Sequence, residues 1–225
     1  MRLIPGKSTP MDNLVYLFSH GFGLTPAFWQ PLLAHFQKEQ CFCIDWSSIE
    51  EPKKLRRLLQ IRFTAKTHFI GIGHSLGFSK LLHSAVPFKA LVGLNAFTHF
   101  LGFGEALCQR RTQEHAHFEN SFRRNAAQTL AAFYQRGGLP TPETPVHHHT
   151  LLADLDLLRQ KATVKAPCLM INGIKDPIVP PALTQDNFRH QEHITLQMMS
   201  SGQHALGFLE APRVVQHMKD FFACL

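Results

Sequence analysis

The sequence predicts an α/β fold in which helices flank a mostly parallel central sheet. Short apolar runs alternate with segments of helical periodicity along most of the chain. Loops rich in glycine or polar residues follow several of these runs, which is typical of the carboxyl ends of buried parallel strands. At 225 residues, the chain is long enough for one well-buried domain.

The alternation sets the expected order of elements. We expect strands at residues 14–18, 41–44, 68–72, 90–94, 168–171 and 194–198. A helix that begins at Thr25-Pro26 should bury the side chains of Phe28, Leu32, Leu33 and Phe36. Residues 97–163 interrupt the pattern with helical spacing alone, including one helix over 118–136. We therefore assign residues 1–96 and 164–225 to the core and residues 97–163 to an inserted helical cap.

The composition indicates a soluble globular protein, with 44% hydrophobic and 17% charged residues. Five cysteines in no disulfide or zinc pattern favour reduced thiols and a cytoplasmic location. No apolar window approaches the roughly 18 residues of a membrane span, so we expect no membrane insertion. The run His147-His148-His149 lacks carboxylate or cysteine partners, and we predict neither a metal nor a cofactor.

The segment Gly73-His74-Ser75-Leu76-Gly77 carries the first chemical signal. An apolar run leads into this G-x-S-x-G pattern and a segment with helical spacing follows it. This order is typical of a nucleophile elbow, a tight turn between a strand and a helix that exposes a serine hydroxyl. The pattern predicts that Ser75 is a covalent nucleophile.

A serine nucleophile requires a base, and the base requires an acid that orients it. Asp176 and His204 each follow an expected strand, in the chain order Ser, Asp, His of an elbow fold. Asp154 and Asp156 are rival acids, but they lie in an expected helix. The spacing thus predicts a triad of Ser75, His204 and Asp176.

Acyl transfer also needs two hydrogen-bond donors for the oxyanion. An elbow fold takes one from the backbone N–H after the nucleophile, here Leu76. The other comes from the loop after the first central strand, where Phe22 lies between Gly21 and Gly23. We interpret His20 as a residue that shapes this loop.

These motifs, together with Gly173-Ile174-Lys175-Asp176-Pro177, resemble those of the α/β-hydrolase family over nearly the whole chain from Leu14. The cap length, its aromatic and arginine residues and the Asp176–His204 spacing look most like the pimeloyl-acyl-carrier-protein methyl ester esterases of biotin biosynthesis. The resemblance implies an α/β-hydrolase fold and a serine carboxylesterase.

The resemblance also implies roles for the cap. Its aromatic residues would line the acyl site: Phe118, Phe122 and Phe133. Its arginines would bind an acidic acyl carrier protein: Arg110, Arg111, Arg123, Arg124 and Arg159. We expect the formal net charge of +7 to gather in this segment, and a monomer that does not bind nucleic acid. Phe78 departs from a glycine common in the family, and we expect it to narrow the acyl pocket.

Three alternatives to this function remain. Another carboxylesterase or a thioesterase would use the same triad without the cap arginines. A lyase of the menaquinone-pathway type would use it to abstract a proton and would release no alcohol. A binding protein on this fold would usually lack a triad member, and the intact set argues against it.

Overall fold

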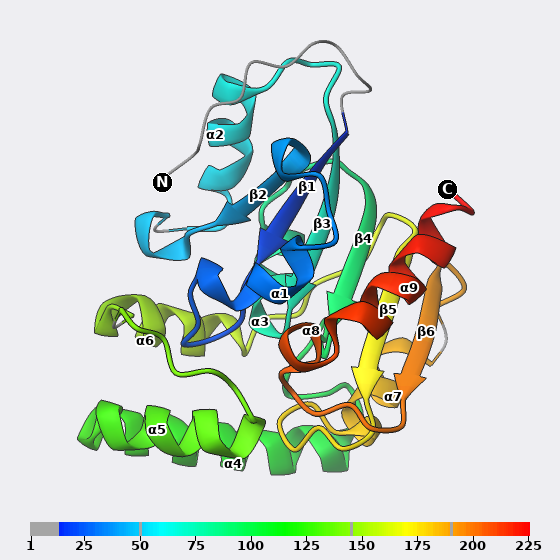
Figure 1. Cartoon of the computed structure of the whole chain (residues 1–225). Helices are drawn as coiled ribbons and strands as arrows, with labels where there is room; N and C mark the ends of the chain where they lie inside the picture. Colours follow the sequence, from blue (N-terminus) through cyan, green and yellow to red (C-terminus); the bar gives the residue numbers. More distant parts are fainter. Residues whose placement is uncertain (1–13, 50, 145, 190) are drawn as a thin grey trace.

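The structure is a computed structural model that describes residues 14–49, 51–144, 146–189 and 191–225. Within these ranges, six strands form one parallel sheet in the order β2-β1-β3-β4-β5-β6 (Figure 1). They are β1 (Leu14–Ser19), β2 (Cys41–Ile44), β3 (His68–His74), β4 (Phe88–Leu94), β5 (Cys168–Gly173) and β6 (Ile194–Met199). All six predicted strands are confirmed, and their carboxyl ends share one edge of the sheet.

The central strands are buried on both faces because their side chains alternate between two apolar clusters. On β5, Leu169 and Ile171 face one cluster, whereas Cys168 and Met170 face the other together with Phe78. The first face is covered by α1 (Gln30–Leu33), α8 (Leu206–Leu209) and α9 (Ala211–Phe222). The second is covered by α2 (Lys54–Arg62), α3 (Leu76–His83) and α7 (Pro181–Phe188).

The first predicted helix is shorter than its apolar spacing suggests. The 3-10 helix η1 (Pro26–Trp29) leads into α1, which ends at Leu33, so Phe36 lies beyond the helix. Pro31 has no N–H to donate, which prevents one continuous helix across this point. Two further 3-10 helices, η2 (Lys38–Gln40) and η3 (Trp46–Ser48), flank β2.

Three helices lie between β4 and β5 in the sequence: α4 (Glu105–Arg124), α5 (Ala126–Gly137) and α6 (His148–Leu157). The predicted single helix over 118–136 is wrong, because Asn125 leaves helical geometry and its side chain accepts a hydrogen bond from the Gln128 N–H. Figure 1 shows α4 and α5 running across the edge toward which the strands point. Leu151 and Leu155 of α6 join them to this edge through a cluster with Phe22.

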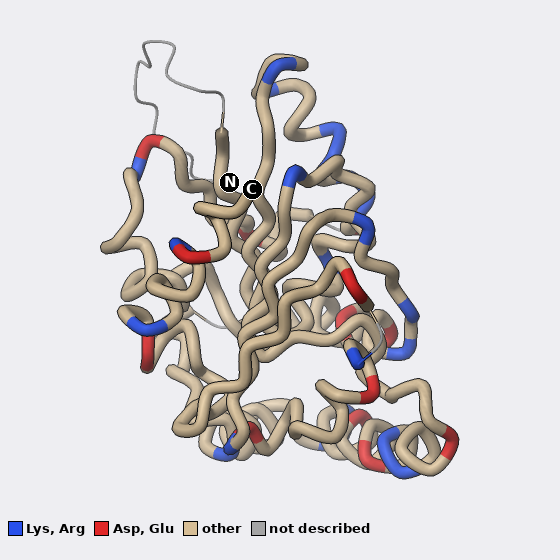
Figure 2. The backbone as a smooth tube through the Cα atoms, turned by 90° about the vertical axis from the view of Figure 1, so that its right-hand side faces the viewer, with Lys and Arg blue, Asp and Glu red and all other residues tan. Residues whose placement is uncertain are grey.

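The basic excess does not gather in residues 97–163, contrary to the prediction. This segment holds seven Lys or Arg residues against six Asp or Glu residues, whereas residues 51–66 hold six against one. Figure 2 shows blue and red residues side by side in the helices of the lower edge. Within the described ranges, no helix combines the length and apolar character needed to cross a membrane.

Candidate active site

Ser75 occupies the sharp turn between β3 and α3. Its backbone lies at φ 52° and ψ −125°, a strained region for a residue with a side chain. The turn packs so closely that a Cβ at Gly73 would lie 2.4 Å from the Phe78 Cα. A Cβ at Gly77 would lie 2.1 Å from the Ser19 carbonyl oxygen. The two glycines of the G-x-S-x-G pattern are therefore sterically required here.

Asp176 and His204 form a buried pair on neighbouring loops at the same edge. Asp176 Oδ2 lies 2.7 Å from His204 Nδ1, and both side chains are almost fully buried. Asp176 Oδ1 accepts the N–H groups of Ile178, at 2.7 Å, and Val179, at 2.9 Å. The carboxylate is thus fixed in place, and His204 Nδ1–H donates to it. This tautomer leaves Nε2 of His204 as a proton acceptor.

His74, which precedes Ser75, places the His204 loop beside the elbow. The rings of the two histidines lie 4.8 Å apart, and His74 Nε2–H donates to the His204 carbonyl at 2.8 Å. Burial lowers the pKa of His74 well below its ordinary value, so the ring is neutral. No role was predicted for His74, because it occupies the variable position of the G-x-S pattern, where the motif specifies no side chain.

Asn95, for which no role was predicted, joins the loops that hold Asp176 and His204. Its Nδ2 donates to the carbonyls of Gln203 and His204, the latter at 2.9 Å. Its Oδ1 accepts the Gly173 N–H at 2.8 Å, in the loop that leads to Asp176. Asn95 itself has φ 47°, a conformation that asparagine tolerates better than most residues. One side chain after β4 therefore sets the relative position of two loops.

The predicted oxyanion donors, Phe22 and Leu76, line the same cavity as Ser75. Leu76 is the first residue of α3, so its N–H has no acceptor within the helix. Gly21 brings the other loop close, since a Cβ there would lie 3.2 Å from the Ser75 Cβ. From α5, Tyr134 donates its hydroxyl to a carbonyl of this loop at 2.6 Å. The two residues predicted to supply the backbone donors thus lie at the same cavity as the serine.

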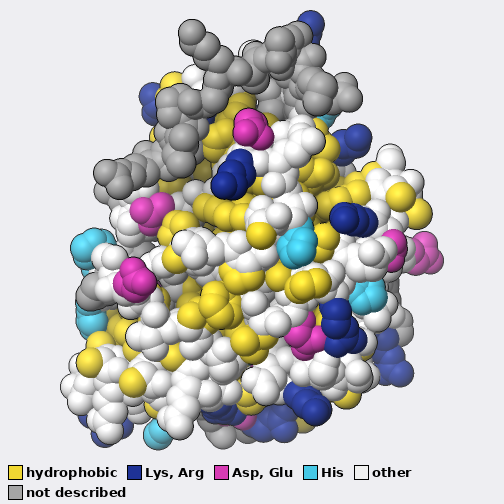
Figure 3. All heavy atoms as spheres, viewed as in Figure 1, with side chains coloured by type: hydrophobic (Ala, Val, Ile, Leu, Met, Phe, Trp, Pro, Cys, Tyr) yellow, Lys and Arg dark blue, Asp and Glu magenta, His cyan; other side chains and the backbone are white. Residues whose placement is uncertain are grey.

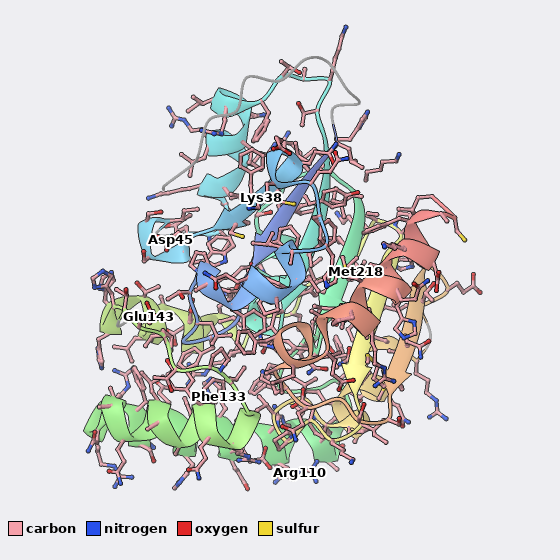
Figure 4. The ribbon with its side chains drawn as sticks, viewed as in Figure 1. Lys38, Asp45, Arg110, Phe133, Glu143 and Met218 are labelled. Atoms are coloured by element: carbon pink, nitrogen blue, oxygen red, sulfur yellow. The ribbon has the colours of Figure 1, made fainter. Side chains whose placement is uncertain are left out.

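The cavity at Ser75 has a volume of about 210 Å³ and is mostly aromatic and aliphatic. Phe118 and Phe133 line it, and both rings contact Phe22 edge-on. In Figure 4, Phe133 lies between α5 and the body of the molecule. Phe122 does not line the cavity, contrary to the prediction, because it is fully buried in the cluster beneath α6. A flexible apolar chain fits such walls.

The five arginines predicted to bind a carrier protein are not placed alike. The prediction that Arg111 binds a carrier protein is wrong, because its side chain is buried and lines the cavity. Arg123 and Arg159 both pair with Glu119, which neutralises part of their charge. Arg110 is exposed and 3.8 Å from Glu114, while Arg124 has no ion pair with another described residue. Figure 4 shows Arg110 at the outer edge, and Figure 3 shows basic side chains along it.

Other predicted features lie away from the nucleophile. Phe78 is buried behind the sheet with Leu91 and Met170, so it does not narrow the pocket as expected. Within the described ranges, no cluster of three His, Cys, Asp or Glu side chains could hold a metal ion. A larger cavity of about 460 Å³ is lined by Lys80 and Asp154 but not by Ser75. This larger cavity is therefore not the one into which Ser75 opens.

Several solved structures have a fold similar to that of this chain. No family model matches the chain, and no curated protein matches it. An esterase from Exiguobacterium antarcticum has a TM-score of 0.73 and 12% identity, covering 92% of this chain and 91% of its own. A lipase-esterase related protein from Clostridium acetobutylicum has a TM-score of 0.70 and 14% identity, covering 93% of this chain and 95% of its own. MenH from S. aureus has a TM-score of 0.68 and 16% identity, covering 97% of this chain and 96% of its own. The chain has the α/β-hydrolase fold.

Proposed function

We propose that this protein is a serine ester hydrolase. The observation that carries the proposal is that the strained Ser75 follows His74, whose ring lies 4.8 Å from the His204 ring of a buried Asp176–His204 pair. Phe22 and Leu76, the proposed oxyanion donors, line the same cavity as Ser75. Two similar solved structures are named as esterases or esterase-related, which is consistent with the proposal. Their sequence identities to this chain are so low that the likeness shows the fold alone.

The proposed reaction has two halves. Ser75 Oγ attacks the ester carbonyl while His204 Nε2 takes its proton, and the Phe22 and Leu76 N–H groups hold the oxyanion. The tetrahedral intermediate collapses, and His204 returns the proton to the leaving alcohol. Water then attacks the acyl-enzyme and gives a proton to His204. When the second tetrahedral intermediate collapses, His204 returns this proton to Ser75 Oγ and the acid leaves. Asp176 keeps His204 in the required tautomer and stabilises the imidazolium.

For the substrate, we propose the methyl ester of a pimeloyl chain on acyl carrier protein, in the biotin pathway. The mostly apolar cavity suits such a chain, and α4 and α5 would act as a cap. The exposed arginines Arg110 and Arg124 would meet the acidic carrier. A cytoplasmic location fits the free thiols of the five cysteines.

The test supplies purified protein with methyl pimeloyl carrier protein and measures released methanol. We expect methanol and pimeloyl carrier protein, still joined through its thioester, in equal amounts. We also expect restored growth without biotin in a strain that lacks its own esterase. Hydrolysis of many simple esters without preference for the carrier-bound one would favour a general carboxylesterase. Consumption of a lyase substrate with no alcohol released from any ester would reject the hydrolase.

Docking of the carrier is tested by charge reversal. We expect Arg124→Glu to lower kcat/KM for the carrier-bound ester, relative to a small ester, by roughly threefold to tenfold. Arg57→Glu is the matched control, because Arg57 is exposed on α2, at the opposite end of the molecule in Figure 1 and in the most basic stretch. An equal loss in both variants would mean that overall charge, not the cap, attracts the carrier.

A further inference from the structure

Arg111 is a buried cation in the wall of the catalytic cavity. From α4, its guanidinium donates to the Phe100 carbonyl at 3.3 Å and to the Ile178 carbonyl at 3.1 Å. It also stacks over the Phe100 ring, 4.1 Å from the centroid. These contacts fix the plane of the guanidinium but do not neutralise its charge. A buried charge of this kind is costly unless a counter-charge meets it.

The counter-charge at Arg111 is weak. Glu114 lies 3.2 Å from Nη1 of Arg111, but its side chain is 53% exposed and is shared with Arg110. Burial lowers the pKa of Arg111, and nearby Arg136 and Arg110 act in the same direction against the opposing effect of Glu114. Arg136 lines the same cavity and donates to the Pro177 carbonyl at 3.2 Å. Among the described lining residues, two guanidinium groups thus face one carboxylate.

The other described residues of the cavity wall supply no further anion. His115 lines it, but this ring bonds to the Leu155 carbonyl, and burial lowers its pKa. The other lining side chains are apolar, apart from Ser75 itself. A guanidinium in such surroundings attracts an anion more strongly than it would in water, and its fork matches carboxylate or phosphate oxygens.

We propose that the cavity is built for esters that carry an anionic group away from the scissile bond, with Arg111 as its partner and Arg136 at the rim. The group is a carboxylate or a phosphate, and on binding it displaces the exposed Glu114. This inference rests on the proposed ester hydrolysis and names the substrate class of the same site. The aromatic walls hold the chain between the two ends.

The test compares two probes that differ only in charge: monomethyl pimelate and the methyl ester of pimelic acid monoamide. We expect the ratio of their kcat/KM values to favour the anion. Arg111→Gln should lower that ratio about tenfold or more, as expected for the loss of a charge-assisted hydrogen bond. Glu114→Gln should raise it, because the competing carboxylate is gone. Arg213→Gln, on α9 and paired with Glu210, should leave it unchanged.

Arg111→Gln should lower the kcat/KM ratio of the two probes and Glu114→Gln should raise it. These opposite changes distinguish a role of Arg111 in binding from a purely structural role. If Arg111→Gln fails to fold, the Glu114→Gln result still decides, since that residue is exposed. A wild-type ratio near one both for these probes and for the thioester pair described below would overturn the proposal while leaving the hydrolase intact. A preference that Glu114→Gln does not raise would overturn it as well. If the wild type hydrolyses neither probe, calorimetry with Ser75→Ala decides: tighter binding of monomethyl pimelate than of the amide supports the subsite, and equal binding rejects it.

The source of the anion is resolved by a second pair of probes. These are the methyl pimeloyl thioesters of phosphopantetheine and of pantetheine, which differ only in the phosphate. A preference for the first that Arg111→Gln removes assigns the subsite to the arm of a carrier. A preference confined to monomethyl pimelate assigns it to free half-esters. Either result supports the anionic subsite, and no preference in both pairs rejects it.

Discussion

At the scale of single residues, the site depends on side chains that have no recognisable motif. Ser75, Asp176 and His204 could be proposed from spacing, because each follows an apolar run. Asn95 could not, since its contacts lie in loops that are 78 to 109 residues away in the chain. The burial of Arg111 was equally hidden, because it depends on how α4 meets the Phe100 loop. Local sequence patterns are thus enough to propose the reacting residues. The residues that position them can be identified only from tertiary contacts.

Asn95→Ala should damage both stability and turnover. Two buried hydrogen bonds and one part-buried hydrogen bond disappear at about 1 kcal/mol each, so urea unfolding should show a loss of about 2–3 kcal/mol. Because the acid and base loops lose their link, kcat should fall more than KM changes. The control is Asn125→Ala, which removes an exposed helix cap worth about 1 kcal/mol. Equal losses of stability in the two variants, with kcat intact, would contradict the positioning role.

At the scale of elements, the sequence predicted strands better than helices. Short apolar runs between loops define strands well, and all six predictions in the described ranges hold. The helical spacing of apolar residues continues through Asn125, although one helix ends and the next begins there. Apolar periodicity gives no sign of a helix cap that forms inside it. The same spacing extended the first predicted helix to Phe36, past the end of α1 at Leu33. Helix ends therefore required the backbone geometry.

An ion pair joins the elbow helix to α6. Lys80 Nζ lies 2.6 Å from Asp154 Oδ1, both side chains are buried, and Lys80 also lies over the Trp46 ring. Burial raises the pKa of Asp154 despite the nearby ammonium. Asp154, discounted as the catalytic acid, thus has a structural contact instead.

Asp154→Ala should cost about 3–5 kcal/mol of unfolding free energy, because it leaves the Lys80 ammonium buried without a partner. The double variant Lys80→Met/Asp154→Leu should regain most of this loss, since two apolar groups of similar size replace the pair. Calorimetric or urea unfolding of the single and double variants measures both values. Additive losses would show that the two residues do not interact.

At the scale of the whole molecule, one edge of the sheet collects the candidate chemistry. Loops after β1, β3, β5 and β6 supply Phe22, Ser75, Asp176 and His204, and α4 and α5 lie across them (Figure 1). The parallel sheet makes this possible, because all carboxyl ends of its strands share one edge. The overall fold could be predicted from alternation alone. The distribution of charge along the chain could be counted from the sequence as well: the excess lies in residues 51–66, around α2, so the prediction that placed it in residues 97–163 was wrong.

The central claim is that Ser75 is a nucleophile activated by His204. The most direct measurement is covalent trapping with a fluorophosphonate, read by mass spectrometry of the intact chain and its peptides. We predict one adduct per chain on the peptide that contains Ser75, lost in Ser75→Ala and slowed by orders of magnitude in His204→Ala. A folded wild-type protein that takes no adduct, or one modified at a residue other than Ser75, would contradict the account.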